Sequence, residues 1–222
     1  MAPRGEGNGK GRGFAPVALA AALAPALLTL AVAALIRVGV LDWSTGFDGL
    51  VMTAGRYLGW AALAVALVGL LNALGDFRAR GAIAVAAVVI ASASAGLHWR
   101  QSIALGAGAP ADVSSDPADP PGQAARVEPA GTCAGVDPVP AQLTARQASN
   151  ALLDAGFAMT RSTVFQVEGV REGFWFGHRR LAIVRIRPGR TDIRVIAEHP
   201  SADGGGSCRL AARLSTALQA IR

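Results

Sequence analysis

Hydrophobic side chains fill three stretches of the first hundred residues without an intervening polar stripe. The stretches are Phe14–Ile36, Tyr57–Gly75 and Gly81–His98. A helix needs about 20 apolar residues to cross a bilayer, with about 17 as the lower limit, and a helix on the surface of a soluble protein would keep one polar face. The pattern therefore predicts three transmembrane helices within residues 14–100, preceded by a short tail over residues 1–13.

Basic residues in the short flanks indicate the orientation of these helices. Arg4, Lys10 and Arg12 precede the first stretch, and Arg78 and Arg80 lie in the turn between the second and the third. Cytoplasmic loops carry the excess of lysine and arginine. We therefore expect a multi-pass inner-membrane protein with a cytoplasmic N-terminus, and we expect the region beyond the third helix to be periplasmic.

The first stretch has a second interpretation. Residues Phe14–Ala34 follow a basic N-terminus and contain small residues at which a signal peptide could be cleaved. The apolar run is longer than the usual signal-peptide core of about 7–15 residues, which favours a retained helix. Cleavage would leave two helices and would put the rest of the chain on the same side of the membrane.

Small residues predict close packing of the helices. Gly55 and Gly59 have the spacing at which membrane helices approach closely. A transport path normally needs polar or ionisable groups within the membrane, and Asn72, Ser92 and Ser94 offer little material for one. We therefore expect a three-helix anchor, with a small transport accessory as a less favoured alternative.

The pattern changes after the third stretch. Residues 101–140 are rich in proline, glycine and alanine, which is typical of a tether. The predicted elements after it are a helix over 141–155, strands over 157–161, 163–176, 181–187 and 191–198, and a helix over 207–221. Within the second strand the apolar positions change parity, which predicts a β-bulge near Gly169. The sequence thus predicts an α-helical membrane anchor followed by an α+β domain over 141–222, with an antiparallel sheet flanked by helices.

One predicted hairpin allows finer statements. Strands 181–187 and 191–198 are joined by a proline-glycine turn, and their apolar residues alternate toward the core. That alternation turns Asp192 and Arg194 outward. The same register sets Arg185 opposite Asp192, and such a pair stabilises a sheet by about 0.2–1 kcal/mol.

Charge and composition argue against a nucleic-acid partner. The formal net charge is +6, and Lys10 is the only lysine among 21 basic residues. A nucleic-acid surface would also need aromatic side chains among its cations, and aromatic residues make up 5% of the chain. We expect no nucleic-acid partner and expect the lipid bilayer as the main one.

Two cysteines, Cys133 and Cys208, fall in the region predicted to be periplasmic. In an oxidising compartment they could pair, and the bridge would tie the tether to the last helix. By the chain-entropy model a loop of this size contributes about 4 kcal/mol. Isolated structural thiols are the alternative. We expect no metal and no cofactor, because the sequence has no CxxC motif and no nearby pair of histidines.

Arginines along the central hairpin offer a candidate binding surface. Arg185, Arg187 and Arg194 are the candidate contacts for an anion or a lipid headgroup, because the guanidinium fork matches phosphate and carboxylate groups. The alternative, which the sequence favours, is a solvated strand face balanced by nearby carboxylates. Gly204–Gly206 precede the last helix, where backbone amides can hold an anion, although a flexible connector is the simpler interpretation.

Candidate catalytic groups form no recognised pattern. The histidines His98, His178 and His199 lack the spacing to a serine and an acid that a nucleophilic triad would show. Carboxylates on the strands would have to converge in a cleft for glycoside chemistry. We therefore predict no catalytic residue.

One set of motifs spans the tether and the central strands. Its residues are Asp116, Pro117, Pro120, Pro121, Glu168, Trp175, Phe176, Gly177, Pro188 and Asp192. In their spacing, over about residues 113–220, they resemble a bacterial domain-of-unknown-function family, number 1499, in its form with three N-terminal spans. Arg180 and Leu181 stand where that family usually has an acidic pair, and His178 replaces its second aromatic residue. The resemblance implies the fold and the anchored layout, and it implies no catalytic residue.

The layout favours a non-enzymatic role. A domain held at a membrane surface without a catalytic motif is most simply a binding or scaffolding module, whose partner would be another envelope protein or a lipid headgroup. The alternative is a cell-envelope enzyme, such as a hydrolase, with an unrecognised site. A deep pocket with converging carboxylates, or a contact between a serine and a histidine, would favour that alternative.

Overall fold

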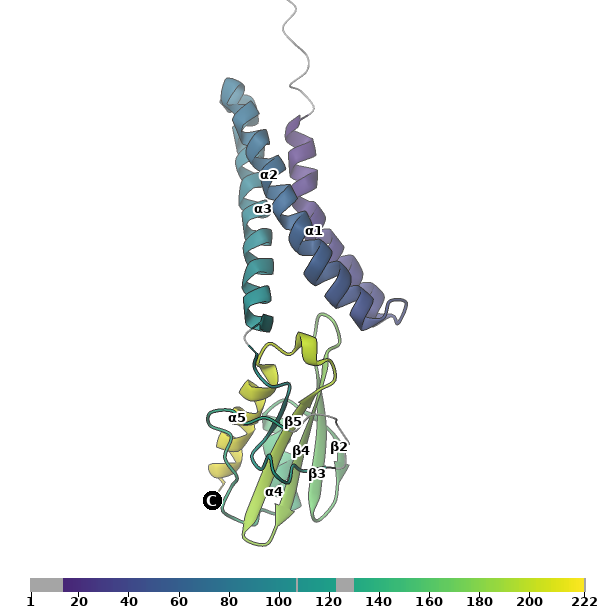
Figure 1. Ribbon diagram of the computed structural model, residues 1–222, viewed down its shortest axis with the longest axis vertical. Coiled ribbons are helices and arrows are strands. Elements are labelled where there is room, and N and C mark those ends of the chain that lie inside the picture. The colour runs from purple at the N-terminus through teal and green to yellow at the C-terminus, as the bar shows by residue number, and fades with distance from the viewer. Residues whose placement is uncertain (1–13, 107, 123–129, 222) are drawn as a thin grey trace, which may run out of the picture. The chain divides into compact units, whose positions relative to one another are not determined.

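The apolar stretches form helices because a backbone in contact with lipid must satisfy its hydrogen bonds within one segment. A computed structural model describes residues 14–106, 108–122 and 130–221 of the chain. It divides into two units, Met1–Ser102 and Ile103–Arg222. Three long apolar helices are followed by a five-stranded antiparallel sheet with flanking helices (Figure 1), which confirms the predicted fold class.

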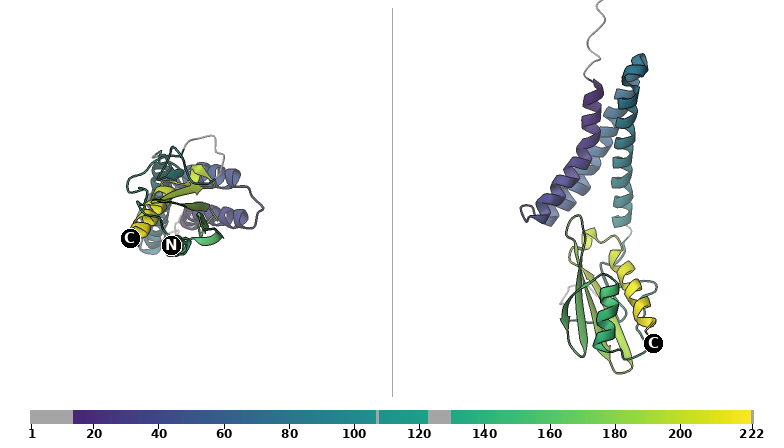
Figure 2. Two further views of the ribbon diagram at one scale, coloured as in Figure 1. Left: turned by 90° about the horizontal axis from the view of Figure 1, so that it is seen from below. Right: turned by 180° about the vertical axis from the view of Figure 1, so that it is seen from behind.

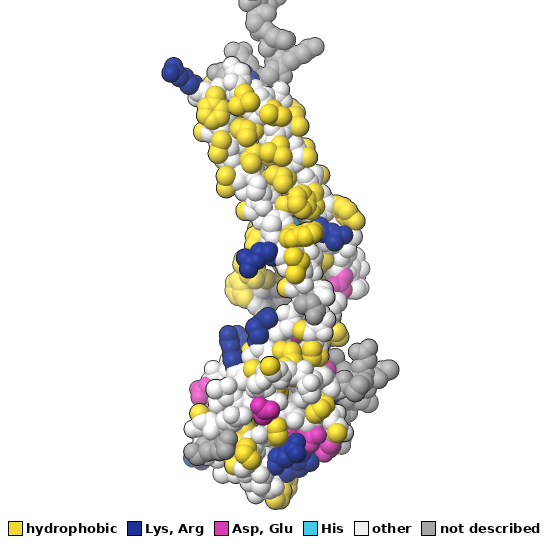
Figure 3. Space-filling model, turned by 60° about the vertical axis from the view of Figure 1, so that its left-hand side comes forward, with side chains coloured by type: hydrophobic (Ala, Val, Ile, Leu, Met, Phe, Trp, Pro, Cys, Tyr) yellow, Lys and Arg dark blue, Asp and Glu magenta, His cyan; other side chains and the backbone are white. Residues whose placement is uncertain are grey.

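Three helical segments are long and apolar enough to cross a membrane, so the protein associates with one. The elements are α1 (Phe14–Arg37), the π-helical η2 (Ser44–Ala54) continued by α2 (Gly55–Ala73), the short η3 (Leu74–Asp76) and α3 (Phe77–Gly106). On the face drawn in Figure 3, hydrophobic side chains cover most of the length of these helices. This covering is what a lipid environment requires.

Two of these segments extend beyond the predicted stretches. The second begins at Ser44, because Phe47 and Val51 of η2 are buried and η2 packs against α1. Apolar contacts thus carry the helix through a region whose polar residues suggested a loop. The third continues past His98 to Gly106.

Small residues form the contacts between the helices, as predicted. A methyl group placed on Gly59 would lie 3.5 Å from the Cα atom of Ala95, and one placed on Gly69 would lie 2.9 Å from the Cβ atom of Ala18. A buried cluster joins all three helices and consists of Ala18, Ala22, Ala62, Ala66, Ala87 and Ala91. Close backbone approach is therefore what holds the anchor together.

The C-terminal unit is a sheet with helices on one face (Figures 1 and 2). Its strands are β1 (Asp112–Ser114), β2 (Ala158–Ser162), β3 (Gln166–Glu172), β4 (Arg179–Arg187) and β5 (Arg190–Ala197), in the order β1-β5-β4-β3-β2 and all antiparallel. The helices are α4 (Ala145–Asp154) and α5 (Gly206–Gln219), with the short η4 (Pro200–Ala202) before α5. The core lies between sheet and helices and includes Leu152, Phe157, Ile193 and Leu214.

Local chemistry sets the start of α4. The Thr144 side chain accepts a hydrogen bond from the Gln147 amide, and the Gln147 side chain accepts one from the Thr144 amide. This capping box satisfies two amides that the first helical turn leaves open. The helix therefore begins at Ala145, after the start at residue 141 that its apolar pattern predicted.

The predicted bulge within the strand near Gly169 is wrong, although the register shift of the neighbouring strand β2 lies opposite Gly169. Pairing between β3 and β4 is continuous from Gln166 to Glu172, and the register shift lies instead on β2, between Met159 and Arg161. The apparent change of parity arose from aromatic residues that follow β3 in a turn. Glycine at position 169 allows close approach of the neighbouring strand, since a methyl group there would lie 3.2 Å from the carbonyl oxygen of Ala158.

The tether contributes to the sheet. β1 pairs with β5, with Val113 opposite Val195, and Val113 is fully buried. Sequence composition predicted no strand here, because proline and glycine dominate the region. Three residues suffice, since their backbone groups pair with a strand that would otherwise form an open edge.

Candidate functional site

The outward face of the sheet carries a charged cluster beneath the tether segment, residues 112–122, which crosses β4 and β5 (Figure 1). Asp192 lies at its centre with no exposed surface. Its carboxylate contacts Arg185 at 3.2 Å, Arg190 at 2.6 Å, and Arg187. The predicted register between Arg185 and Asp192 is confirmed. Asp192 and Arg194 lie on the face away from the core, as predicted. The expectation that this face is solvated is wrong for both, because the tether covers them.

Two further aspartates reach this cluster from the tether segment. Asp116 contacts Arg187 at 3.1 Å and Arg190 at 3.0 Å, and Asp119 contacts Arg185 at 3.1 Å. Burial opposes ionisation of Asp116, but the hydrogen bond from Arg187 and the neighbouring charges outweigh it and lower the pKa of the carboxyl group. Burial likewise opposes the charge on Arg187, and the three carboxylates nevertheless raise the pKa of its guanidinium group. Asp116 and Arg187 are therefore ionised at neutral pH.

Arg194 forms the most buried ion pair of this face. Its side chain is 3% exposed, and it binds Asp112 through two hydrogen bonds of 2.9 and 2.7 Å. A third hydrogen bond, of 3.1 Å, goes to the carbonyl oxygen of Pro121. The two-pronged geometry is the strong form of an arginine–carboxylate contact.

The candidate anion contacts Arg185, Arg187 and Arg194 thus share one face, and each contacts carboxylates of its own chain. The four arginines of this face are matched by four aspartates, from Asp112 to Asp192. Their main role in this arrangement is to hold the tether segment on the sheet. Contact of these arginines with a headgroup stays a prediction.

Most residues that carry the family resemblance fall into two places, while Glu168 lies on β3 and Pro188 in the turn between β4 and β5. Asp116, Asp192, Pro120 and Pro121 belong to the tether contact, and Gly122 continues it with φ +85°, against Ile183. Trp175, Phe176 and Gly177 form the turn between β3 and β4, where Gly177 has φ +69°. Trp175 stays 62% exposed. The tether contact is therefore structural, and the turn between β3 and β4 is exposed surface.

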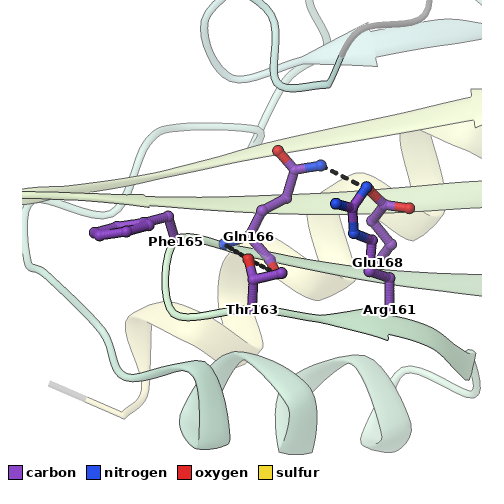
Figure 4. A pocket seen from close by; sticks show the side chains of 5 residues that line it. All are labelled: Arg161, Thr163, Phe165, Gln166 and Glu168. Carbon is purple, nitrogen blue, oxygen red and sulfur yellow. Dashed lines mark hydrogen bonds between the residues drawn. The ribbon is translucent and has the colours of Figure 1, made fainter.

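An open hollow of about 380 Å³ lies beside the edge strand β2 (Figure 4). It is lined by Arg161, Thr163, Phe165, Gln166 and Glu168. The Gln166 side-chain amide donates a hydrogen bond of 2.6 Å to Glu168, so the motif residue Glu168 is held in place. This lining suits a polar ligand or an extended peptide more than an apolar molecule.

Buried serine side chains of the domain make structural hydrogen bonds. The Ser207 hydroxyl is buried and donates a hydrogen bond of 2.9 Å to Asp203, which also accepts one from Arg180. The serine proton is thus directed to a carboxylate. Ser114 and Ser115 bond the backbone of Ile193, which gives them a structural role.

His178 is buried beside His199, with 5.9 Å between the ring centres. Burial, followed by the positive charge of Arg180, lowers the pKa of His178 to about 4. The imidazole is therefore neutral at neutral pH. Among the described residues, no group of three or more histidine, cysteine, aspartate or glutamate side chains is arranged to hold a metal ion.

The depressed pKa of His178 predicts acid sensitivity. An unfolded chain takes up this proton below the ordinary pKa of 6.5, whereas the folded domain resists it down to about 4. The contribution of His178 to the free energy of unfolding is therefore fully present above pH 6.5, and the free energy falls by about 3 kcal/mol as the pH drops to 4. Urea denaturation at several pH values, monitored by deuterium uptake, should show this loss of stability in the parent protein and in His199→Gln. In His178→Gln the free energy of unfolding should depend less on pH. Identical profiles for all three would contradict the assignment.

Cys133 and Cys208 form a disulfide, with 5.7 Å between their Cα atoms. The bridge closes a separation of 75 residues and ties the tether to α5, as predicted. Both cysteines pack against the domain core. The alternative of isolated thiols is wrong, because the fold brings the two cysteines together.

Several residues of these sites were missed at the level of sequence. Asp112 and Asp119 lie in a segment whose composition predicts only a tether. The signal that could have identified them is that aspartates spaced along it complement arginines at alternate strand positions. Arg171, Arg209 and Arg213 line a second hollow and were not singled out. Their helix and strand positions share no sequence motif, so only the fold brings them together.

Comparisons with protein-family models, with curated proteins and with solved structures give no match for this chain.

Proposed function

We propose that this protein is a non-enzymatic binding or scaffolding module, anchored in the inner membrane with its C-terminal domain in the periplasm. The observation that carries the proposal is the Cys133–Cys208 disulfide, in a domain that follows three candidate membrane spans. Disulfides persist in oxidising compartments and are rare in the cytosol. The biased flanking charges support the same orientation, and membership of the family number 1499 remains part of the proposal.

The charged face favours binding over hydrolysis. A glycosidase needs one protonated carboxylic acid beside a carboxylate, whereas the carboxylates near Arg187 each pair with an arginine, and the pKa of Asp116 is lowered. The same contacts lock the tether and leave open hollows at the ends of β2 and α5. Rigid support next to an open polar surface suits recognition of a partner.

The orientation is tested with one pair of cysteine variants in intact cells. Val164→Cys introduces a thiol at a position that is 73% exposed in the domain, and Ala79→Cys introduces one at the exposed start of α3. The native cysteines are bonded to each other and do not react. A membrane-impermeant maleimide should label the first variant before lysis and the second only after it, because the two positions lie on opposite sides of the membrane.

The reverse result would place the domain in the cytoplasm and would contradict the proposal. Enzymatic function is checked separately on the purified full chain. Turnover of a chromogenic ester or glycoside, lost in Asp192→Asn with the fold preserved, would favour the envelope hydrolase instead.

A further inference from the structure

Four arginines meet where the start of α5 packs on the sheet. Arg171 comes from the end of β3, Arg180 from the start of β4, and Arg209 and Arg213 from α5. They line an open hollow of about 380 Å³, here called the arginine hollow. Its other lining residues are Glu172, Gly173, Phe174, Gly206 and Leu210.

Like charges oppose each other inside this hollow. Arg171 and Arg180 are direct partners in the register of β3 and β4, and like charges at that spacing destabilise a sheet. Glu172 is the only carboxylate in the lining, and Asp203 is buried beneath Arg180. Counted with Asp203, the residues that line the hollow carry an excess of two positive charges, which a bound anion would compensate. Asp154 lines a neighbouring hollow with Arg171 and Arg213.

Structural contacts hold three of the guanidinium groups in place. Arg171 donates a hydrogen bond of 2.9 Å to the carbonyl oxygen of Ala155. Arg180 donates one of 2.9 Å to Asp203. Arg209 donates one of 3.1 Å to the carbonyl oxygen of Gly204. An arginine has five N–H donors, so these contacts fix each group and leave donors for a ligand.

The glycines before α5 allow this arrangement. A methyl group on Gly206 would lie 2.7 Å from the Cζ atom of Arg180, so only glycine lets that guanidinium group lie against the first turn of the helix. Gly204 and Gly205 have φ values of +51° and +74°, which other residues adopt at a cost. Gly206 is thus part of the lining of the hollow, and Gly204 and Gly205 form the turn that leads into it.

We propose that the arginine hollow binds a phosphate group, carried either by a lipid headgroup or by a soluble phosphate ester. Guanidinium forks match phosphate oxygens, and the N-terminus of α5 adds a favourable dipole. Phe174, 80% exposed, offers an apolar contact to the rest of the ligand. This assignment rests on the proposed binding function and names its ligand class.

The test is a titration of the purified full chain in a neutral detergent by isothermal calorimetry. The probes are inorganic phosphate, dihexanoyl phosphatidylglycerol and the zwitterionic dihexanoyl phosphatidylcholine. Arg213→Gln should weaken phosphate binding about tenfold, and Gly206→Ala should weaken it by displacing Arg180. The matched control is Arg146→Gln, an exposed arginine of α4, which should bind like the parent protein.

The outcomes separate the ligand sources. Tighter binding of phosphatidylglycerol than of inorganic phosphate supports a headgroup, and phosphate binding without lipid binding supports a soluble ester. Absence of binding, or equal losses in Arg213→Gln and Arg146→Gln, overturns the proposal. An intact disulfide on a non-reducing gel verifies the fold of each variant. The labelling experiment is independent, so a failure here leaves the periplasmic orientation standing.

Discussion

Replacing Asp192 with asparagine is expected to lower the free energy of unfolding of the C-terminal domain by about 3 kcal/mol. The carboxylate is fully buried and contacts three arginines. The substitution keeps the shape of the side chain and removes its charge, so the guanidinium groups keep their desolvation cost and lose part of their compensation. Asp116 and Asp119 still contact these arginines, which keeps the loss at the lower end of the range for a broken buried pair.

The measurement is urea denaturation of the purified full chain in detergent, followed by deuterium uptake of peptides from β5 and β1. The matched control is Asp137→Asn, an exposed aspartate before α4, whose effect should stay within about 0.5 kcal/mol. In Asp192→Asn, the tether segment should also exchange faster, because its aspartates bind the same arginines. Equal midpoints for the two variants would refute the structural role of this cluster.

Loss of the Cys133–Cys208 disulfide is expected to cost about 4 kcal/mol, by the chain-entropy estimate for a closed loop of this size. The bridge ties the tether to α5 across 75 residues, so its removal frees the segment that carries β1. The double variant Cys133→Ser, Cys208→Ser should therefore unfold at a lower urea concentration, and deuterium uptake should rise first in β1.

A reducing agent provides the internal control for this prediction. It should lower the urea midpoint of the parent protein and leave that of the double variant unchanged. An equal fall of the urea midpoint in the parent protein and in the double variant would show that the reducing agent acts on something other than the disulfide. An unchanged midpoint in the double variant would show that core packing alone holds the tether.

Local patterns were enough for much of this fold. Apolar length predicted the three membrane helices, since about 20 residues must span the bilayer whatever the helices pack against. Strand alternation predicted the register of the β4–β5 hairpin, with Arg185 opposite Asp192, because neighbouring strands joined by a tight turn have little freedom of register. Small residues predicted the close approach of α2 and α3 at Gly59.

The sequence alone determined most elements of this protein, though not β1 or η2, and the apolar side of the strands of the β4–β5 hairpin, because these depend on neighbours a few residues away. Only the tertiary structure decided what covers the polar side. Arg194 meets Asp112 across 82 positions, and Arg171 meets α5 through the packing of helix on sheet. Alternation distinguishes the core face from the other face, but a face turned away from the core can be solvated or covered by a distant segment. That choice depends on where the chain returns, which no local pattern records.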